Sequence, residues 1–157
     1  MKLKVCGLSN SVGIKTCVRY NVNFCGFILN YSKSHRFISF EKAKKLLDVN
    51  KNQTHFVGVL VNPSLEELEK FSKLNLDYFQ LYGQYDNKSL INIKNKFRKK
   101  IIITIQVKNR DDIETYKKVE DGADIILWDS TGYEKSLGWK HNWIKDIKTK
   151  REKMIAG

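Results

Sequence analysis

Residues 56–67 read FVGVLVNPSLEE, and this stretch decides the fold class. The first six residues form a continuous apolar run, which is typical of a parallel strand buried on both faces of its sheet. Pro63 follows, and Ser64 and Glu67 then have the spacing of a capping box, which starts a helix. A buried strand that leads directly into a helix predicts an α/β fold with a parallel sheet.

The same strand-then-helix unit recurs on both sides of this stretch. Other strand-like runs lie at residues 3–6, 24–29, 78–81, 101–105 and 125–128, and a seventh begins at residue 154. Apolar residues at helical spacing fall between the strands, within residues 14–18, 40–47, 65–71 and 90–97. A repeat of roughly 20–30 residues suits a doubly wound sheet or an eightfold barrel. No G-x-G-x-x-G follows the first strand and no Walker motif is present, which disfavours nucleotide-binding α/β folds.

Composition narrows the class of protein further. The chain has 157 residues, enough for one domain, and 41% of them are hydrophobic. The three cysteines lack CxxC spacing and the three histidines show no HExxH pattern, so neither a disulfide framework nor a metal site is expected. The apolar N-terminal run is too short for a signal peptide, and no run has the length of a membrane helix. These features predict a cytoplasmic protein that does not bind membranes.

The net charge of +12 has two interpretations. A concentrated positive surface would indicate nucleic acid or another polyanion. The excess is mostly lysine and is spread along the chain, which favours a solvated surface and predicts no nucleic-acid partner. The aromatic residues Tyr133, Trp139 and Trp143 could form a stacking surface. However, Trp143, Ile144 and Ile147 have helical spacing, which favours a sixth helix packed on the sheet.

Reactive side chains stand at the ends of two strand-like runs. The first run ends in Lys4-Val5-Cys6-Gly7, and the sixth ends in Leu127-Trp128-Asp129-Ser130. In a β/α barrel, chemistry takes place at the carboxyl ends of the strands. A cysteine and an aspartate there could transfer protons. From position alone, Cys6 could equally be a small core residue and Asp129 a helix cap.

Six short segments, taken in order, resemble motifs of the phosphoribosylanthranilate isomerase family. They are KVCGL at 4–8, CGFIL with SKSHRFIS at 25–39, VGVLVN at 57–62, FQLYG at 79–83, LWDS at 127–130 and IAG at 155–157. The resemblance implies a (β/α)8 TIM barrel that is incomplete and ends in strand seven. Residues 1–157 would then be a single domain lacking the last one to two β/α units.

The sequence departs from the family pattern at three other places. Tyr82 stands where the family has a histidine, and His35 stands where it has a proline. The glycine-rich stretch that usually follows the aspartate is replaced by residues 131–139. Tyr82 is expected to be a wall or core residue, and the last departure changes the loop that would close over a substrate.

The resemblance also implies an activity. The family isomerises N-(5-phosphoribosyl)anthranilate to 1-(2-carboxyphenylamino)-1-deoxyribulose 5-phosphate, an Amadori rearrangement in tryptophan biosynthesis. No cofactor is needed, because the substrate nitrogen accepts the electrons.

By the same resemblance, Cys6 is the catalytic base and Asp129 the catalytic acid. Arg36 binds the anthranilate carboxylate with a planar guanidinium fork. Gln80 and Gly157 also bind substrate. The partner is this small phosphorylated molecule alone, and the protein is a monomer or homodimer. Because phosphate is held by the loops after strands seven and eight, residues 1–157 alone are expected to be inactive.

Two alternatives stay open at this point. One is another phosphosugar-binding barrel enzyme, such as a ribulose-phosphate epimerase. That reaction normally uses two acidic residues with a metal ion, whereas the first strand here ends in Cys6. The other alternative is a non-catalytic, basic binding module on a barrel framework. Salt-dependent binding to DNA would favour it.

Overall fold

The computed structural model describes residues 2–131 and 138–157, and it divides the chain into two compact units, Met1–Gln80 and Leu81–Gly157. Strand β4 (Tyr78–Tyr82) carries the chain from the first unit into the second. The strands follow one another in the sheet in the order of the sequence, from β1 to β7. The alternating strands and helices predicted from the sequence are therefore confirmed.

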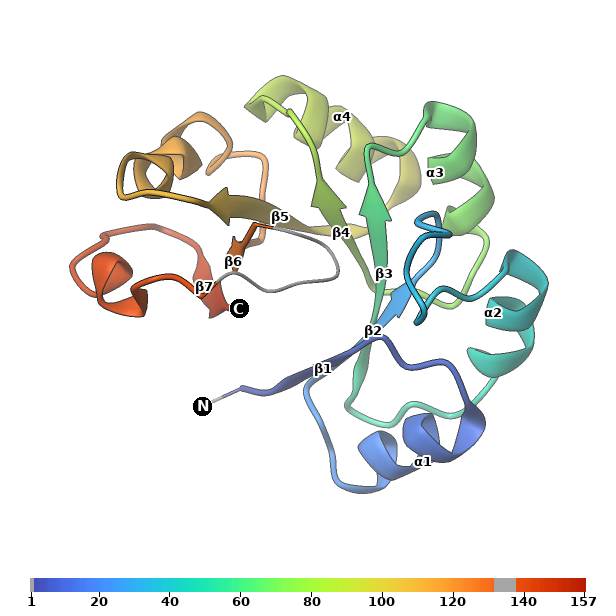
Figure 1. The fold of residues 1–157 in the computed structure, drawn as a ribbon. Coiled ribbons are helices and arrows are strands. Elements are labelled where there is room, and N and C mark those ends of the chain that lie inside the picture. Colours follow the sequence, from blue (N-terminus) through green and yellow to red (C-terminus); the bar gives the residue numbers. More distant parts are fainter. Residues whose placement is uncertain (1, 132–137) are drawn as a thin grey trace. The chain divides into compact units, whose positions relative to one another are not determined.

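The first unit contains three complete strand–helix pairs. They are β1 (Lys4–Cys6) with α1 (Ser11–Arg19), β2 (Phe24–Ile28) with α2 (Phe40–Leu46), and β3 (His55–Val61) with α3 (Leu65–Ser72). The strands pair in parallel, with Val5 opposite Cys25 and Cys25 opposite Phe56. All five residues of β2 are buried, as its unbroken apolar run predicts. Figure 1 shows the three helices on the outer side of these strands.

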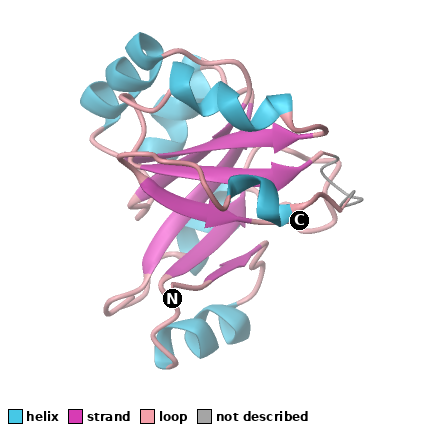
Figure 2. Ribbon diagram, turned by 90° about the vertical axis from the view of Figure 1, so that its left-hand side faces the viewer, coloured by secondary structure: helices cyan, strands magenta, loops and turns pink. Residues whose placement is uncertain are grey.

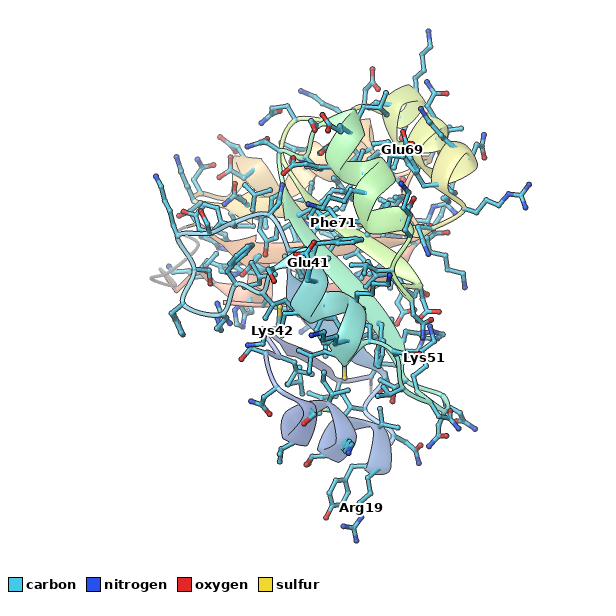
Figure 3. The ribbon with its side chains drawn as sticks, turned by 90° about the vertical axis from the view of Figure 1, so that its right-hand side faces the viewer. Arg19, Glu41, Lys42, Lys51, Glu69 and Phe71 are labelled. Carbon is cyan, nitrogen blue, oxygen red and sulfur yellow. The ribbon has the colours of Figure 1, made fainter. Side chains whose placement is uncertain are left out.

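Local sequence signals start the helices of this unit. The Ser64 side chain accepts a hydrogen bond from the backbone N–H of Glu67, and the Glu67 side chain accepts one from the Ser64 backbone, so the predicted capping box is confirmed. Helices α2 and α3 contact each other through Phe40 and Phe71, whose ring centroids lie 6.3 Å apart. Figure 3 looks onto these two helices and shows the buried Phe71 together with the exposed Glu41 of α2.

The second unit continues the pattern with less regular helices. It contains α4 (Asn87–Phe97), β5 (Lys100–Val107), the 3-10 helix η1 (Asp111–Lys118), β6 (Ile125–Ser130), the 3-10 helix η2 (His141–Ile144) and β7 (Glu152–Ile155). Strands β5, β6 and β7 pair in parallel, and Gln106 lies opposite Asp129. Figure 2 draws the strands in magenta and the helices in cyan.

The prediction of a regular sixth helix around Trp143, Ile144 and Ile147 is wrong. The structure has only the four-residue 3-10 helix His141–Ile144 at this position, with no side-chain hydrogen bond at its N-cap. Without a cap, the first N–H groups of a helix lose the partner that normally stabilises its first turn. Ile144 is nevertheless buried, so the expected packing role is confirmed for this residue.

An asparagine or aspartate stands immediately before β2, β4 and β6. Its side chain binds the backbone at or just before the start of the preceding strand, which is β1, β3 or β5. In each case the side-chain oxygen accepts a hydrogen bond from a backbone N–H: Leu3 N to Asn23 at 2.9 Å, Phe56 N to Asp77 at 2.7 Å, and Ile101 N to Asp124 at 2.8 Å. Lysines reinforce the two aspartates, Lys51 at 2.8 Å from Asp77 and Lys94 at 3.0 Å from Asp124. The repeated contact sets the register between successive strands.

Replacing Asp124 with alanine is expected to lower the free energy of unfolding by about 1–3 kcal/mol, the usual cost of a buried polar group left without its partner. The Ile101 N–H loses its acceptor in this variant. Lys94→Ala removes only the ion pair, whose side chains are 31% and 29% exposed, so a loss below about 1 kcal/mol is expected. Urea titration followed by circular dichroism measures both. Equal losses in the two variants would contradict a role for the backbone contact.

Candidate functional site

Cys6 is an exposed thiol at the carboxyl end of β1. The space in front of it exists because residue 26, its neighbour in β2, is glycine. A Cβ atom at Gly26 would lie 2.9 Å from Cys6 Sγ and 3.0 Å from Lys4 Nζ. The thiol and the ammonium group therefore lie on the same face of the sheet, and a positive charge stands near the predicted base.

Arg36 lies against the residue that follows Cys6. Gly7 has a φ of +81°, and a Cβ atom there would lie 2.5 Å from Arg36 Cδ, so a side chain at this position would collide with the arginine. Arg36 Nε is buried and has no hydrogen-bond partner among the described residues. A buried N–H group of a charged side chain without an acceptor is costly. This N–H is therefore suited to bind an oxygen atom of an anionic ligand, within reach of the Cys6 segment.

Gln80 is buried in β4, with 1% of its surface exposed. It lies two residues before Tyr82, so both side chains point to the same face of the strand. The structure thus places the predicted substrate-binding amide inside the fold.

Asp129 is half-buried near the end of β6, and both of its carboxylate oxygens accept hydrogen bonds. Tyr82 Oη donates to Oδ2 at 2.7 Å, and the backbone N–H of Ser130 donates to Oδ1 at 2.8 Å. Charge-assisted bonds of this kind fix a carboxylate more firmly than neutral ones. The carboxyl group that the sequence predicts as an acid is therefore held in one orientation.

Gly157 packs directly against Ser130, the neighbour of Asp129. It has a φ of +94°, and a Cβ atom there would lie 2.6 Å from the Ser130 Cβ atom. The preceding segment is held by Trp139, whose Nε1 donates to the Ala156 carbonyl at 2.9 Å. Glycine at 157 thus lets the chain after β7 approach the end of β6.

Four of the five predicted site residues form one pair in each unit, and Gln80 belongs to neither pair. Cys6 and Arg36 meet around Gly7 in the first, and Asp129 and Gly157 meet around Ser130 in the second. Tyr82, expected to be a wall or core residue, is buried as predicted. It also donates a hydrogen bond to the predicted acid, a contact that sequence reasoning missed. Tyr133 and the replaced loop at 132–137 lie outside the described residues.

The described residues contain neither a metal-binding cluster nor a membrane-spanning helix. Within residues 2–131 and 138–157, no group of three or more histidine, cysteine or acidic side chains is placed to hold a metal ion. In the same part of the chain, no helix is both long enough and apolar enough to span a membrane.

The three thiols are expected to differ sharply in reactivity. Cys6 is exposed, whereas Cys17 and Cys25 are buried. Burial, followed by the neighbouring Cys17, raises the pKa of Cys25 to about 12. At pH 8 its thiolate fraction is then about one in ten thousand, and the thiolate is the form that reacts.

Iodoacetamide should modify one thiol per folded chain, at Cys6, and all three in denaturant. Peptide mass spectrometry identifies the modified residue, and equal labelling of Cys25 would contradict the burial.

Comparison with known proteins places this fold and these motifs in a family. The family described as N-(5'phosphoribosyl)anthranilate (PRA) isomerase has a sequence model that matches residues 3–157. The chain belongs to the PRA isomerase family.

Individual relatives agree with the family match. The N-(5'-phosphoribosyl)anthranilate isomerase of Streptococcus gordonii is 33% identical over 142 residues, which cover 88% of this chain and 67% of the relative. The enzyme of the same name from Petrotoga mobilis is 32% identical over 165 residues, covering 100% of this chain and 75% of the relative. The chain therefore spans about two thirds to three quarters of these PRA isomerases.

A solved structure supports the fold independently of sequence. The crystal structure of phosphoribosyl anthranilate isomerase from Thermus thermophilus superposes with a TM-score of 0.77, at 20% identity, over 92% of this chain and 70% of that chain. The seven parallel strands with intervening helices are thus part of a (β/α)8 barrel, as the sequence motifs implied.

Proposed function

We propose that this PRA isomerase family member catalyses the Amadori rearrangement of N-(5'-phosphoribosyl)anthranilate to 1-(2-carboxyphenylamino)-1-deoxyribulose 5-phosphate. The observation that carries the proposal is the family match over residues 3–157. The two reactive side chains that the motifs single out support it. Cys6 is at the end of β1 and Asp129 is near the end of β6, the ends of the strands at which barrel enzymes carry their chemistry.

In this proposal Asp129 is the general acid. Its carboxyl proton moves to the furanose ring oxygen, the bond between that oxygen and C1 breaks, and the anthranilate nitrogen lone pair forms a C=N bond to C1. The product of this step is an open-chain iminium ion, and Asp129 becomes a carboxylate. The hydrogen bonds from Tyr82 and from the Ser130 N–H then stabilise the new negative charge.

Cys6 is the general base. As a thiolate it removes the proton from C2, and the electrons of the broken C–H bond form a C1=C2 double bond while the iminium nitrogen becomes neutral. The resulting enolamine tautomerises to the ketose, so no atom is gained or lost overall. The exposure of Cys6 gives a substrate direct access to the thiol.

Arg36 is proposed to bind the anthranilate carboxylate. Its Nε–H is buried and lacks an acceptor among the described residues, so a carboxylate oxygen would supply the missing partner. Gln80 is proposed to hydrogen-bond the sugar, and the backbone at Gly157 to contribute to the phosphate site. Since the substrate nitrogen accepts the electrons, the proposed chemistry uses no cofactor.

The remaining parts of the proposal concern location and partners. We place the protein in the cytoplasm, as a monomer or homodimer, with the phosphorylated substrate as its ligand and neither nucleic acid nor membrane as partner. No observation on the structure favours the phosphosugar epimerase or the basic binding module over the isomerase.

The isomerase activity is tested with the fused chain, which we define as residues 1–157 joined at Gly157 to the C-terminal segment that continues the barrel in a full-length relative. Turnover of N-(5'-phosphoribosyl)anthranilate is followed by the change in anthranilate fluorescence. Growth of a bacterial tryptophan auxotroph that lacks this isomerase provides a second readout. A folded fused chain that neither turns over the substrate nor restores growth would refute the proposal, and salt-dependent DNA binding by the same protein would favour the binding module.

Arg36→Lys is expected to lower kcat/KM about 10- to 100-fold, because an ammonium group cannot reproduce a two-pronged guanidinium contact. A substrate made from aniline lacks the carboxylate, so wild type and variant should handle it within about twofold of each other. Lys33→Arg in the same loop is an exposed control that should leave both substrates unaffected. An equal loss of kcat/KM on both substrates in Arg36→Lys would show that the arginine does not bind the carboxylate.

A further inference from the structure

Tyr82 and Asp129 form a close pair that the family motif does not contain. Tyr82 Oη lies 2.7 Å from Asp129 Oδ2, although the two residues are 47 positions apart in the sequence. Tyr82 is only 8% exposed, so water has little access to the hydroxyl. A hydrogen bond to a charged group in such a setting is stronger than the same bond at the surface. The pair is therefore a hydrogen bond within the fold, largely shielded from water, and not a contact between two exposed side chains.

Each oxygen atom of the Asp129 carboxyl group accepts a hydrogen bond. Oδ2 is held by Tyr82 from β4 and Oδ1 by the Ser130 N–H, at 2.8 Å. Gln106 of β5 lies opposite Asp129 in the sheet. With one anchor on each oxygen, rotation of the carboxyl group about its bond to Cβ would break a hydrogen bond. Only the remaining lone pairs stay available for a transferable proton.

The phenol suits both protonation states of an acid. A tyrosine hydroxyl can donate one hydrogen bond and accept others. When Asp129 is ionised, Tyr82 donates to Oδ2; when Asp129 carries a proton on one of its remaining lone pairs, Tyr82 can still donate to Oδ2, and that proton stays free to move to the substrate. The contact can therefore persist while the proton leaves, which a phenylalanine at this position would not allow.

We propose that Tyr82 is the positioning residue of the general acid: its hydroxyl orients the Asp129 carboxyl group toward the ring oxygen of the substrate and stabilises the carboxylate left after proton transfer. This inference rests on the isomerase function proposed above. It gives Tyr82, which stands where the family motif has a histidine, a specific role in this chain.

The test removes the hydroxyl and keeps the ring. In the fused chain, Tyr82→Phe should lower kcat about 10- to 100-fold, the range expected for a lost hydrogen bond to a charged group. KM should stay within about twofold, since Tyr82 acts on the acid and not on substrate binding. Tyr82→His restores a donor and should recover part of the lost kcat. Tyr78→Phe is the matched control: Tyr78 lies in the same strand and packs against Phe24, with ring centroids 5.6 Å apart. It should keep wild-type kcat.

A double-mutant cycle separates positioning from a general structural effect. In an Asp129→Asn background, Tyr82→Phe should change kcat by less than about twofold, because the group it orients can no longer act as an acid. An equal loss in both backgrounds overturns the proposal, as does a wild-type kcat in Tyr82→Phe or an effect confined to KM. Thermal unfolding confirms that the variants are folded. If Tyr82→Phe is unfolded, Tyr82→His is used in its place. A kcat of Tyr82→His no higher than that of Asp129→Asn then overturns the proposal. A fused wild type without turnover refutes the isomerase function itself, and the positioning role falls with it.

Discussion

Cys6→Ala and Asp129→Asn should each lower kcat of the fused chain about 100-fold or more. A positioned acid or base contributes about 10²–10⁴-fold to a proton transfer. Alanine at position 6 leaves no group to remove the C2 proton. Asparagine at position 129 can keep both contacts, since its Oδ1 accepts from the Ser130 N–H and its Nδ2 can donate to the Tyr82 oxygen, so the local structure is kept while the transferable proton is lost. Anthranilate fluorescence gives kcat and KM for both.

Matched controls make this result specific to the two positions. Cys17→Ala removes a buried thiol from α1, and Asp48→Asn removes an exposed carboxylate; neither residue belongs to the predicted site. Each should retain kcat within about twofold, although Cys17→Ala should lose some stability from the cavity it creates. If Cys6→Ala or Asp129→Asn turns over substrate at a near-normal rate, that residue is not the base or acid.

The strands were predictable because their apolar runs are buried on both faces. Residues 56–61 are an example, and the structure places β3 at His55–Val61. The ends of β5 and β6 were not predictable in the same way. Gln106 and Asp129 are polar, yet they pair in register at the ends of these strands. The ladder is formed by backbone groups, so it continues past the point where the hydrophobic pattern stops.

The partly wrong prediction of a sixth helix shows the limit of spacing arguments. Trp143, Ile144 and Ile147 have helical periodicity, but the segment has no capping side chain and forms only a four-residue 3-10 helix. By contrast, Ser64 combined periodicity with a capping box, and that helix was located correctly. Periodicity identifies a buried face, whereas the cap decides whether a regular helix begins there.

The candidate site was predictable one residue at a time but not as a set of contacts. Cys6 and Asp129 were visible because they end strand-like runs. Tyr82 was read as wall or core because an aromatic residue in an apolar run usually packs in the interior. Its hydrogen bond joins positions 47 residues apart, and only the folded chain brings them together. A sequence signal did exist, since Tyr82 also lies at the carboxyl end of its strand and carries a polar tip.

The asparagine and aspartates that precede β2, β4 and β6 were also readable in the sequence. Asn23, Asp77 and Asp124 each stand immediately before an apolar run, a position that could be taken for simple loop polarity. The structure shows that each accepts a hydrogen bond from the start of the preceding strand. A repeated polar residue at one end of successive strands can thus indicate register, because a buried N–H group needs an acceptor.

Residues 1–157 produced alone are expected to show no isomerase turnover, whereas the fused chain is expected to be active. An eight-stranded barrel closes only when its last strand pairs with its first, and the strand order of the described chain has β1 at one end and β7 at the other. Unpaired edges favour association with other chains, so the isolated polypeptide should also tend to oligomerise. Phosphate binding in these barrels depends on loops after strands seven and eight. For these two reasons we expect no turnover from a polypeptide that consists of residues 1–157 alone.

The expected contrast is measured with one preparation of each polypeptide. Fluorescence turnover and sedimentation velocity are compared for residues 1–157, for the fused chain, and for residues 1–157 mixed with the separate C-terminal segment. Recovery of activity in the mixture would show that the seven-stranded part already holds its site residues in a usable arrangement, since barrel halves can associate through the strand edges that they leave open. Asp129→Asn in the fused chain is the matched inactive control, with the same length and the same barrel closure. A monomeric polypeptide of residues 1–157 that unfolds cooperatively and turns over substrate at the rate of the fused chain would show that closure by an eighth strand is not required for this chemistry.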